Sequence, residues 1–214
     1  MININGVTKN FDHNNILKGI SLNIAEGERV YITGKNGSGK TTLLNILLGF
    51  ENYDRGNVNM DVDPSDVQII YQNQERDQYL TVADEMELAT ILHGGVLNSE
   101  YEQFLNISNK KKRLSKLSGG EWQKLQVIKS IAASPKVLIT DEITTGLDYE
   151  SRKSLYEILK TFLSKNKSTY LSVSHYEEEI NLFADKVVTL KEGFLYTYDN
   201  KNKDFKFEGD LSYE

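Results

Sequence analysis

The sequence predicts an α/β fold with a mainly parallel sheet core, and two observations carry this prediction. After residue 118, helical and strand-like patterns alternate, with helices expected over 119–133, 149–164 and 176–183 and strands over 137–140, 169–173 and 187–198. Strands that alternate with helices form βαβ units, in which helices cover both faces of a parallel sheet. The second observation is a glycine-rich segment, 34–42, which stands between a β-rich run and an apolar helical run.

The earlier part of the chain supplies the remaining elements. Short apolar or β-branched runs near the N-terminus predict strands there. Residues 80–117 interrupt the alternation with helical patches, which predicts a small inserted helical lobe. We therefore predict a single domain over 1–214, with a core of 1–79 and 118–214 and a lobe over about 80–117. The expected strands are 2–7, 20–24, 29–33 and 67–71, the expected helices are 41–48, 82–92 and 100–105, and the tail 199–214 is expected to be an edge hairpin or a frayed end.

Composition excludes several classes of function. Of the 214 residues 39% are hydrophobic, so the chain can bury a core and is not natively disordered. The net charge is -6 with both signs mixed along the chain, so no nucleic-acid partner is expected. No cysteine is present, which excludes disulfides and thiolate chemistry. Neither a run of about 18 apolar residues nor a cationic segment followed by an apolar one occurs, so we expect no membrane span and no secretory signal.

Residues 34–41 match the pattern G-x-x-x-x-G-K-[ST], which is typical of loops that wrap phosphate groups. The glycines let successive backbone N–H groups point inward, and the following helix adds its positive N-terminal end. Lys40 is expected to reach the β and γ phosphates, and the Thr41 hydroxyl to bind Mg2+. The structural alternative is a plain glycine-rich turn before a helix. A loop of this type, called a P-loop, occurs in kinases, GTPases and motor ATPases alike, so by itself it does not decide between these classes. The other residues expected to contact the ligand are Asn36, Gly37, Ser38, Gly39 and Thr42.

The segment Leu117-Ser-Gly-Gly-Glu121 begins a predicted helix. Ser118 followed by Glu121 forms a capping box, so a well-capped helix is the structural interpretation. Capping does not require Gly119 and Gly120, which cost helix stability in the first turn. Exposed N–H groups and a small hydroxyl at a positive helix end instead favour a second anion site at Ser118, Gly119 and Gly120.

Two adjacent carboxylates, Asp141 and Glu142, follow the apolar strand over 137–140. Beside a P-loop, the first carboxylate at a strand end is expected to hold Mg2+ and the second to polarise a water molecule. A solvated pair of acids at a strand terminus is the alternative.

Several motifs in this order resemble the ATP-binding subunits of ABC transporters, and the resemblance covers nearly the whole chain. It implies a P-loop NTPase fold that includes an N-terminal antiparallel β section. The five-residue string LSGGE alone would occur by chance in well under about one chain per thousand. The motifs are GKNGSGKTT (34–42), Tyr71-Gln72 followed by Leu80-Thr-Val82, LSGGE (117–121), LITDE (138–142), TTGLD (144–148) and Ser174-His175.

The resemblance implies roles for single residues outside these loops. Phe11 would stack on adenine, with a core or edge aromatic as the alternative. Gln72 would sense the γ-phosphate and join the metal site, with a plain surface glutamine as the alternative and Gln74 as a less well-spaced rival. His175 would contact the γ-phosphate. Asp148 would communicate across a dimer, although it also suits the N-cap of the next helix.

The implied mechanism uses two copies that pack head to tail with two-fold symmetry. The segment Ser118 to Gly120 of one copy would contact the γ-phosphate of ATP bound by the other. Glu142 would orient or deprotonate the attacking water with help from His175, while Lys40 and Mg2+ neutralise developing charge.

The chain also departs from the family pattern. Ile143 replaces the proline that usually follows the catalytic glutamate, and Lys129 replaces an arginine, which keeps the charge but loses bidentate geometry. Glu121 and Trp122 replace a more usual polar pair, and the helical lobe is short for the family. Basic residues over 110–113 are interpreted as a solvated loop, with a membrane partner or anionic lipid as the alternative.

From the resemblance we predict an ATP-binding and ATP-hydrolysing subunit of a membrane transporter, with ATP and Mg2+ as cofactors. Its expected partners are a separate transmembrane permease and a second nucleotide-binding subunit, as a homodimer or pseudo-dimer. It is expected to be cytoplasmic and peripheral on the inner face of the cell membrane. Export is expected, because the compact chain carries no regulatory domain after its final strands. Alternatives are a soluble ABC-type ATPase in cofactor assembly or another non-transport process, and a catalytically dead nucleotide-binding module.

Overall fold

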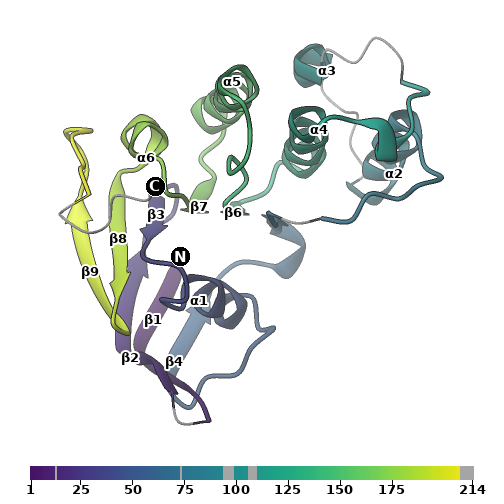
Figure 1. The fold of residues 1–214 in the computed structure, drawn as a ribbon. Helices are drawn as coiled ribbons and strands as arrows, with labels where there is room; N and C mark the ends of the chain where they lie inside the picture. The colour runs from purple at the N-terminus through teal and green to yellow at the C-terminus, as the bar shows by residue number, and fades with distance from the viewer. Residues whose placement is uncertain (13, 73, 94–98, 106–109, 208–214) are drawn as a thin grey trace. The chain divides into compact units, whose positions relative to one another are not determined.

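The computed structural model, drawn in Figure 1, describes residues 1–12, 14–72, 74–93, 99–105 and 110–207. The chain divides into two compact units. The first unit comprises Met1–Asp63 and Thr169–Glu214, and the second unit comprises Pro64–Ser168. Within the described ranges, no helix has the length and apolar character that crossing a bilayer requires.

The first unit contains a three-stranded antiparallel sheet in the order β2-β1-β4. β1 (Ile2–Phe11) pairs with β2 (Asn14–Ile24) and with β4 (Arg55–Met60). Alternate residues of β1 are buried, as expected for strands with one face against a core. The predicted antiparallel section is thus confirmed, but β1 and β2 extend well beyond 2–7 and 20–24, and β4 was not predicted. Its segment carries mainly glycine and polar side chains, so neighbouring strands rather than its own pattern define it.

The same unit contains parallel strands. β3 (Arg29–Thr33) lies between β7 (Thr169–Val173) and β8 (Lys186–Lys191) and is parallel to both, while β9 (Phe194–Asp199) is antiparallel to β8. All of β7 and nearly all of β3 are buried, which explains why both sequences read as continuous runs rather than alternating ones. The helices of this unit are α1 (Lys40–Leu47) and α6 (Glu177–Phe183).

The second unit pairs β5 (Val67–Ile70) in parallel with β6 (Val137–Asp141). α4 (Gly119–Ala132) packs against α2 (Val82–His93), α3 (Ser99–Leu105) and α5 (Tyr149–Lys165), as Figure 1 shows. α4 buries residues around most of its circumference, among them Leu125, Ile128 and Ile131, because it has helical neighbours on several sides. Two short 3-10 turns, Pro64–Asp66 and Leu114–Lys116, complete the unit.

The two ends of the segment 80–117 lie side by side in the second unit. The backbone N–H of Val82 donates to the carbonyl of Lys112 at 3.0 Å, and that of Leu114 donates to Leu80 at 3.0 Å. Glu85 on α2 forms an ion pair with Lys129 on α4, so the lysine that replaces an arginine keeps an acidic partner. The boundaries of a separate lobe stay a prediction, because α2 and α3 pack on α4 within one unit.

The start of α4 is fixed by the predicted capping box. The Ser118 hydroxyl accepts a hydrogen bond from the Glu121 N–H at 3.2 Å, and the Glu121 carboxylate accepts one from the Ser118 N–H at 2.7 Å. The Lys112 ammonium donates to both oxygens of that carboxylate, at 2.9 and 2.8 Å. The pKa of Glu121 is therefore lowered, first by the hydrogen bond from Lys112 and then by that from the Ser118 backbone. Lys112, one of the basic residues over 110–113 that are predicted to be solvated, therefore binds the capping carboxylate.

Replacing Phe162 by alanine should lower the free energy of unfolding by about 3–5 kcal/mol, because the ring is 1% exposed on α5 and its loss leaves a cavity. Denaturant titration followed by circular dichroism would measure the change. Lys160→Ala, an exposed position on the same helix, serves as control and should alter stability by about 0.5 kcal/mol or less. Equal losses for both variants would contradict the assignment of Phe162 to the core.

The capping box should also make stability depend on pH. A carboxylate whose pKa is lower in the folded protein contributes stability above its unfolded pKa, and this contribution is lost as pH falls through its folded pKa. Glu121→Gln should therefore lower the free energy of unfolding by about 1 kcal/mol at neutral pH, and the difference should vanish below the folded pKa. Unfolding titrations over an acidic pH series would test this, with the exposed Glu157→Gln as control. A difference that persists at the lowest pH would contradict the role of the charge.

Candidate nucleotide-binding site

The P-loop follows β3 in the first unit, and its backbone leaves no room for side chains at two positions. At Gly34 φ is +146°, and an added Cβ would lie 2.4 Å from the carbonyl oxygen of Leu190 and 2.7 Å from the Ser38 Oγ. At Gly39 φ is +103°, and a Cβ would lie 2.7 Å from a methyl carbon of Ile16. Contacts below 3.0 Å force atoms to shift, so glycine is required at both positions for packing as well as for conformation.

The Lys40 ammonium lies inside this loop. Its Nζ donates to the carbonyls of Gly34 at 2.8 Å and Lys35 at 3.3 Å, and the residue is 6% exposed. The N-cap of α1 is Gly39, so no side chain competes with a ligand for the amides of the first turn. The Ser38 Oγ is buried and has no hydrogen-bond partner within the part of the chain that the structure describes. A buried cation, uncapped helix amides and an unsatisfied hydroxyl together suit the oxygens of a phosphate chain.

His175 follows β7 at the same sheet edge as the P-loop. β3 and β7 are parallel, and Ile32 pairs with Val173, so the carboxyl ends of both strands lie side by side. His175 is half-buried in the turn between β7 and α6. Phe11 ends β1 and is 43% exposed, with the Lys9 ammonium 4.5 Å from its ring centre. Phe11 is therefore an edge aromatic rather than a core one, and its role toward adenine stays a prediction.

In the second unit, Asp141 is the last residue of β6 and is 9% exposed, while Glu142 is half-buried. Glu142 has φ of +50°, a left-handed conformation that costs a residue with a Cβ about 1–3 kcal/mol. The turn after it is held by the Thr145 N–H, which donates to the Glu142 carbonyl at 3.1 Å, and by Ile143, which is buried where a proline was expected. Sequence patterns carry no signal for such a backbone conformation, so this feature was missed.

The two glycines at the start of α4 differ in their surroundings. A Cβ at Gly120 would lie 2.3 Å from the Oγ of Ser151 on α5, so helix packing requires glycine there. At Gly119 the nearest atom would be 3.8 Å away, on Leu147, so packing leaves room for a side chain. The sequence analysis predicts an anion site at both glycines. The structure gives Gly120 a packing role and leaves Gly119 without one.

Asp148 caps α5, which confirms its structural interpretation. Its carboxylate accepts hydrogen bonds from the Ser151 N–H at 2.9 Å and from the Ser151 hydroxyl at 2.7 Å. These two bonds, the side-chain one first, lower the pKa of Asp148. The proposed role across a dimer remains a prediction.

Gln72 and Gln74 both line a pocket of about 450 Å³ within the second unit, together with Gly119 and the turn 145–147. Arg76, also in its wall, donates to the Leu117 carbonyl at 2.6 Å and lies 5.6 Å from the centre of the Trp122 ring. The Trp122 ring, at a position where a polar residue is more usual in the family, thus packs against the Arg76 guanidinium. Arg76 and Trp122 lie far apart in the sequence and belong to no shared motif, so the sequence did not predict their contact.

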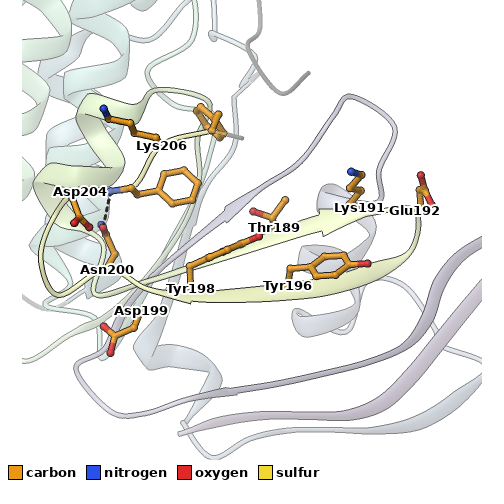
Figure 2. A pocket seen from close by; sticks show the side chains of 11 residues that line it. Thr189, Lys191, Glu192, Tyr196, Tyr198, Asp199, Asn200, Asp204 and Lys206 are labelled. Carbon is orange, nitrogen blue, oxygen red and sulfur yellow. Dashed lines mark hydrogen bonds between the residues drawn. The ribbon is translucent and has the colours of Figure 1, made fainter. Parts of the chain in front are cut away.

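A larger hollow, of about 720 Å³, lies in the first unit (Figure 2). Tyr196 and Tyr198 of β9 line it together with Thr189 of β8 and residues 204–207. None of the predicted site residues is among the described residues in its wall.

Comparison with curated proteins finds ATP-binding proteins of transporters. The spermidine/putrescine import ATP-binding protein PotA of Photobacterium profundum is 31% identical over 209 residues, covering 90% of this chain and 56% of its own. The sulfate/thiosulfate import ATP-binding protein CysA 1 of Agrobacterium fabrum is 29% identical over 232 residues, covering 96% of this chain and 67% of its own. The chain thus spans little more than half of the first relative. The predicted export is not confirmed, since both names specify import.

Solved structures share the fold. A dimeric ATP-binding cassette in a post-hydrolysis state, bound to ADP and Pi, has a TM-score of 0.77 at 23% identity and covers 94% of this chain and 99% of its own. A bacterial Atm1-family ABC exporter with ATP bound has a TM-score of 0.76 at 21% identity and covers 94% of this chain and 39% of its own. These likenesses confirm the predicted P-loop fold.

The family follows from the sequence comparison. A family model described as ABC transporter matches residues 17–145, more than half of the chain. The matched region contains the P-loop, the start of α4 and the two carboxylates at the end of β6, Asp141 and Glu142. This chain therefore belongs to the ABC transporter family.

Proposed function

We propose that this chain binds and hydrolyses ATP and, paired with a second nucleotide-binding subunit, powers a membrane transporter. The observation that carries the proposal is the buried Lys40 ammonium inside a loop whose two fixed glycines admit no side chain. A glycine-rich loop of this kind suits a polyphosphate, because its backbone amides can bind phosphate oxygens.

In the first unit, the triphosphate would be held by the amides of the loop and of the first turn of α1. Lys40 would exchange its carbonyl partners for β and γ phosphate oxygens, because an anion is a stronger partner than a carbonyl. The unsatisfied hydroxyl of Ser38 would gain an acceptor. Phe11 would stack on adenine, since its side chain is 43% exposed. The remaining contacts would come from Asn36, Gly37, Gly39, Thr41 and Thr42.

Mg2+ fits the oxygen donors of Thr41, Gln72 and Asp141, since hydroxyl, amide and carboxylate oxygens are the ligands that this ion prefers. When bound, it would neutralise charge on the phosphates. Thr41 is exposed at the start of α1, whereas Asp141 is 9% exposed at the end of β6.

Hydrolysis requires a water molecule whose oxygen bonds to the γ-phosphorus while the bond to the β–γ bridging oxygen breaks. Glu142 would accept the proton of that water, and His175 would assist by contacting the γ-phosphate. Lys40 would neutralise the charge that develops on the leaving ADP. The left-handed backbone of Glu142 supports this assignment, because strained residues persist where function retains them.

The site would be completed by a second copy, whose Ser118, Gly119 and Gly120 approach the γ-phosphate. Ser118 and Gly119 are exposed, and a Cβ at Gly119 would meet its nearest neighbour, Leu147, only at 3.8 Å, so the positive end of α4 is accessible to an anion. Asp148, at the start of α5, would lie near the same interface. Two head-to-tail copies would then enclose two ATP molecules.

The transport partner would be a separate membrane-spanning permease that holds the chain at the inner face of the membrane. The relatives named for polyamine and sulfate import support uptake over the export expected from the sequence. Transport assays with the co-purified permease would decide the direction. Fractionation wholly with cytosol, with no membrane partner, would instead favour a soluble ABC-type ATPase.

Glu142→Gln should lower kcat for ATP hydrolysis by about a hundredfold or more while ATP binding persists, because the amide cannot accept the proton of the attacking water. Phosphate release and calorimetric titration with ATP would measure the two quantities. Glu150→Gln, an exposed acid nearby on α5, should leave both unchanged. An unaltered kcat in Glu142→Gln would exclude this residue as the base.

A site shared by two copies should allow complementation. Lys40→Ala removes the phosphate cation, and Gly119→Asp places a negative charge at the anion site without a packing clash, so each variant alone should be inactive. Mixing them should restore hydrolysis, because a mixed dimer has one site built from two intact halves. Steady-state ATPase assays of mixtures would measure the recovery. Mixing each variant with itself at the same total concentration is the control, and absence of recovery would argue against the shared site.

A further inference from the structure

Glu179 on α6 is a buried carboxylate to which the proposed hydrolysis gives no role. It is 1% exposed and lies against two other buried residues of the first unit. The Tyr31 hydroxyl donates to its Oε1 at 3.1 Å, and the Ser174 hydroxyl donates to its Oε2 at 3.0 Å. Since an unsatisfied buried carboxyl group is costly, these two donors explain how the group is tolerated in the core but not why it is there.

The second donor, Ser174, directly precedes His175. Its hydroxyl accepts a hydrogen bond from the Tyr176 N–H at 3.2 Å, and its own N–H donates to the Ile32 carbonyl on β3 at 3.4 Å. One hydroxyl therefore bridges the residues on both sides of His175. The Glu179 carboxylate fixes the orientation of that hydroxyl, because a hydroxyl that donates to the carboxylate has its lone pairs available for the Tyr176 amide.

The first donor, Tyr31, connects the same carboxylate to the strand that leads into the P-loop. Burial raises the pKa of Tyr31 well above its usual value, with smaller contributions from Tyr170 and Glu179. The phenol therefore stays protonated and remains a donor. Tyr31 is three residues before Gly34, so Glu179 bridges the P-loop strand and the turn that carries His175.

We propose that Glu179 is a positioning residue for His175: through Ser174 and Tyr31 it holds the imidazole-bearing turn in register with the P-loop strand. This inference rests on the proposed function, in which His175 contacts the γ-phosphate. It makes Glu179 part of hydrolysis without contact to the substrate. A merely structural carboxylate would affect stability and not the chemical step.

The test compares Glu179→Gln with Glu178→Gln, its exposed neighbour on the same helix. The amide keeps the volume of the carboxylate and can still accept from Tyr31 through its oxygen, but its NH2 group cannot accept from Ser174. Glu179→Gln should lower kcat for ATP hydrolysis about tenfold, with KM for ATP unchanged. The loss is comparable to that seen when a metal-binding histidine loses the residue that hydrogen-bonds and orients it. Glu178→Gln should match the natural chain in both constants.

A double-mutant cycle with His175→Ala separates positioning from general destabilisation. If Glu179 acts through His175, Glu179→Gln should cause no further loss of kcat in the His175→Ala background. Ser174→Ala should reproduce the effect of Glu179→Gln, and Ser174→Thr, which keeps the hydroxyl, should restore activity. Additive losses in the cycle, or full activity of Glu179→Gln, would overturn the inference while leaving the proposed ATPase intact.

A second readout does not depend on turnover. The ring 1H–13C resonances of His175, assigned by their loss in His175→Ala, should shift in Glu179→Gln and Ser174→Ala and stay in place in Glu178→Gln. Unshifted resonances in Glu179→Gln would overturn the inference. Absence of ATP hydrolysis in the natural chain would instead contradict the proposed function, and the resonances would still decide whether Glu179 positions the ring.

Discussion

The P-loop passes β8 so closely that position 34 has no room for a side chain. A side chain at Gly34 would meet the Leu190 carbonyl at 2.4 Å, so the loop can leave β3 only along the backbone of the neighbouring strand. This approach depends on the parallel pairing of β3 with both β7 and β8. It also determines where α1 begins, because the loop must turn back at Gly39 against Ile16. The position of the Lys40 ammonium follows from that path.

The parallel elements were predictable because burial on both faces leaves a strong sequence signal. The strands β3, β6 and β7 contain nearly continuous apolar or β-branched runs, and their predicted ranges agree with the observed ones within one residue. The strand β4 carries no such run, and its pairing partner β1 lies some fifty residues away in sequence. Contacts of that kind depend on the assembled sheet, and no local pattern can encode them.

The candidate site also has features that the sequence predicts and features that it does not. Residue types and spacing pointed to Lys40, Asp141 and Glu142, and the fold places each at the end of a strand or the start of a helix. The left-handed backbone of Glu142 and the cation–π contact between Arg76 and Trp122 were not predictable, because the first is a torsion angle and the second joins residues 46 positions apart. The structural alternatives for Ser118 and Asp148 are real, since both cap helices, and capping does not prevent either from also meeting a ligand.

Ser151 joins features that the sequence presents as separate. Its hydroxyl donates to the cap of α5 at Asp148, and the same side chain fills the space beside Gly120 at the start of α4. Any side chain at position 120 would therefore displace the residue that completes the neighbouring helix cap. The two adjacent glycines therefore meet different physical constraints: packing forbids a side chain at position 120 and leaves room for one at position 119. In a library of variants, the two positions would be depleted at different stages, the first at expression and the second only at activity.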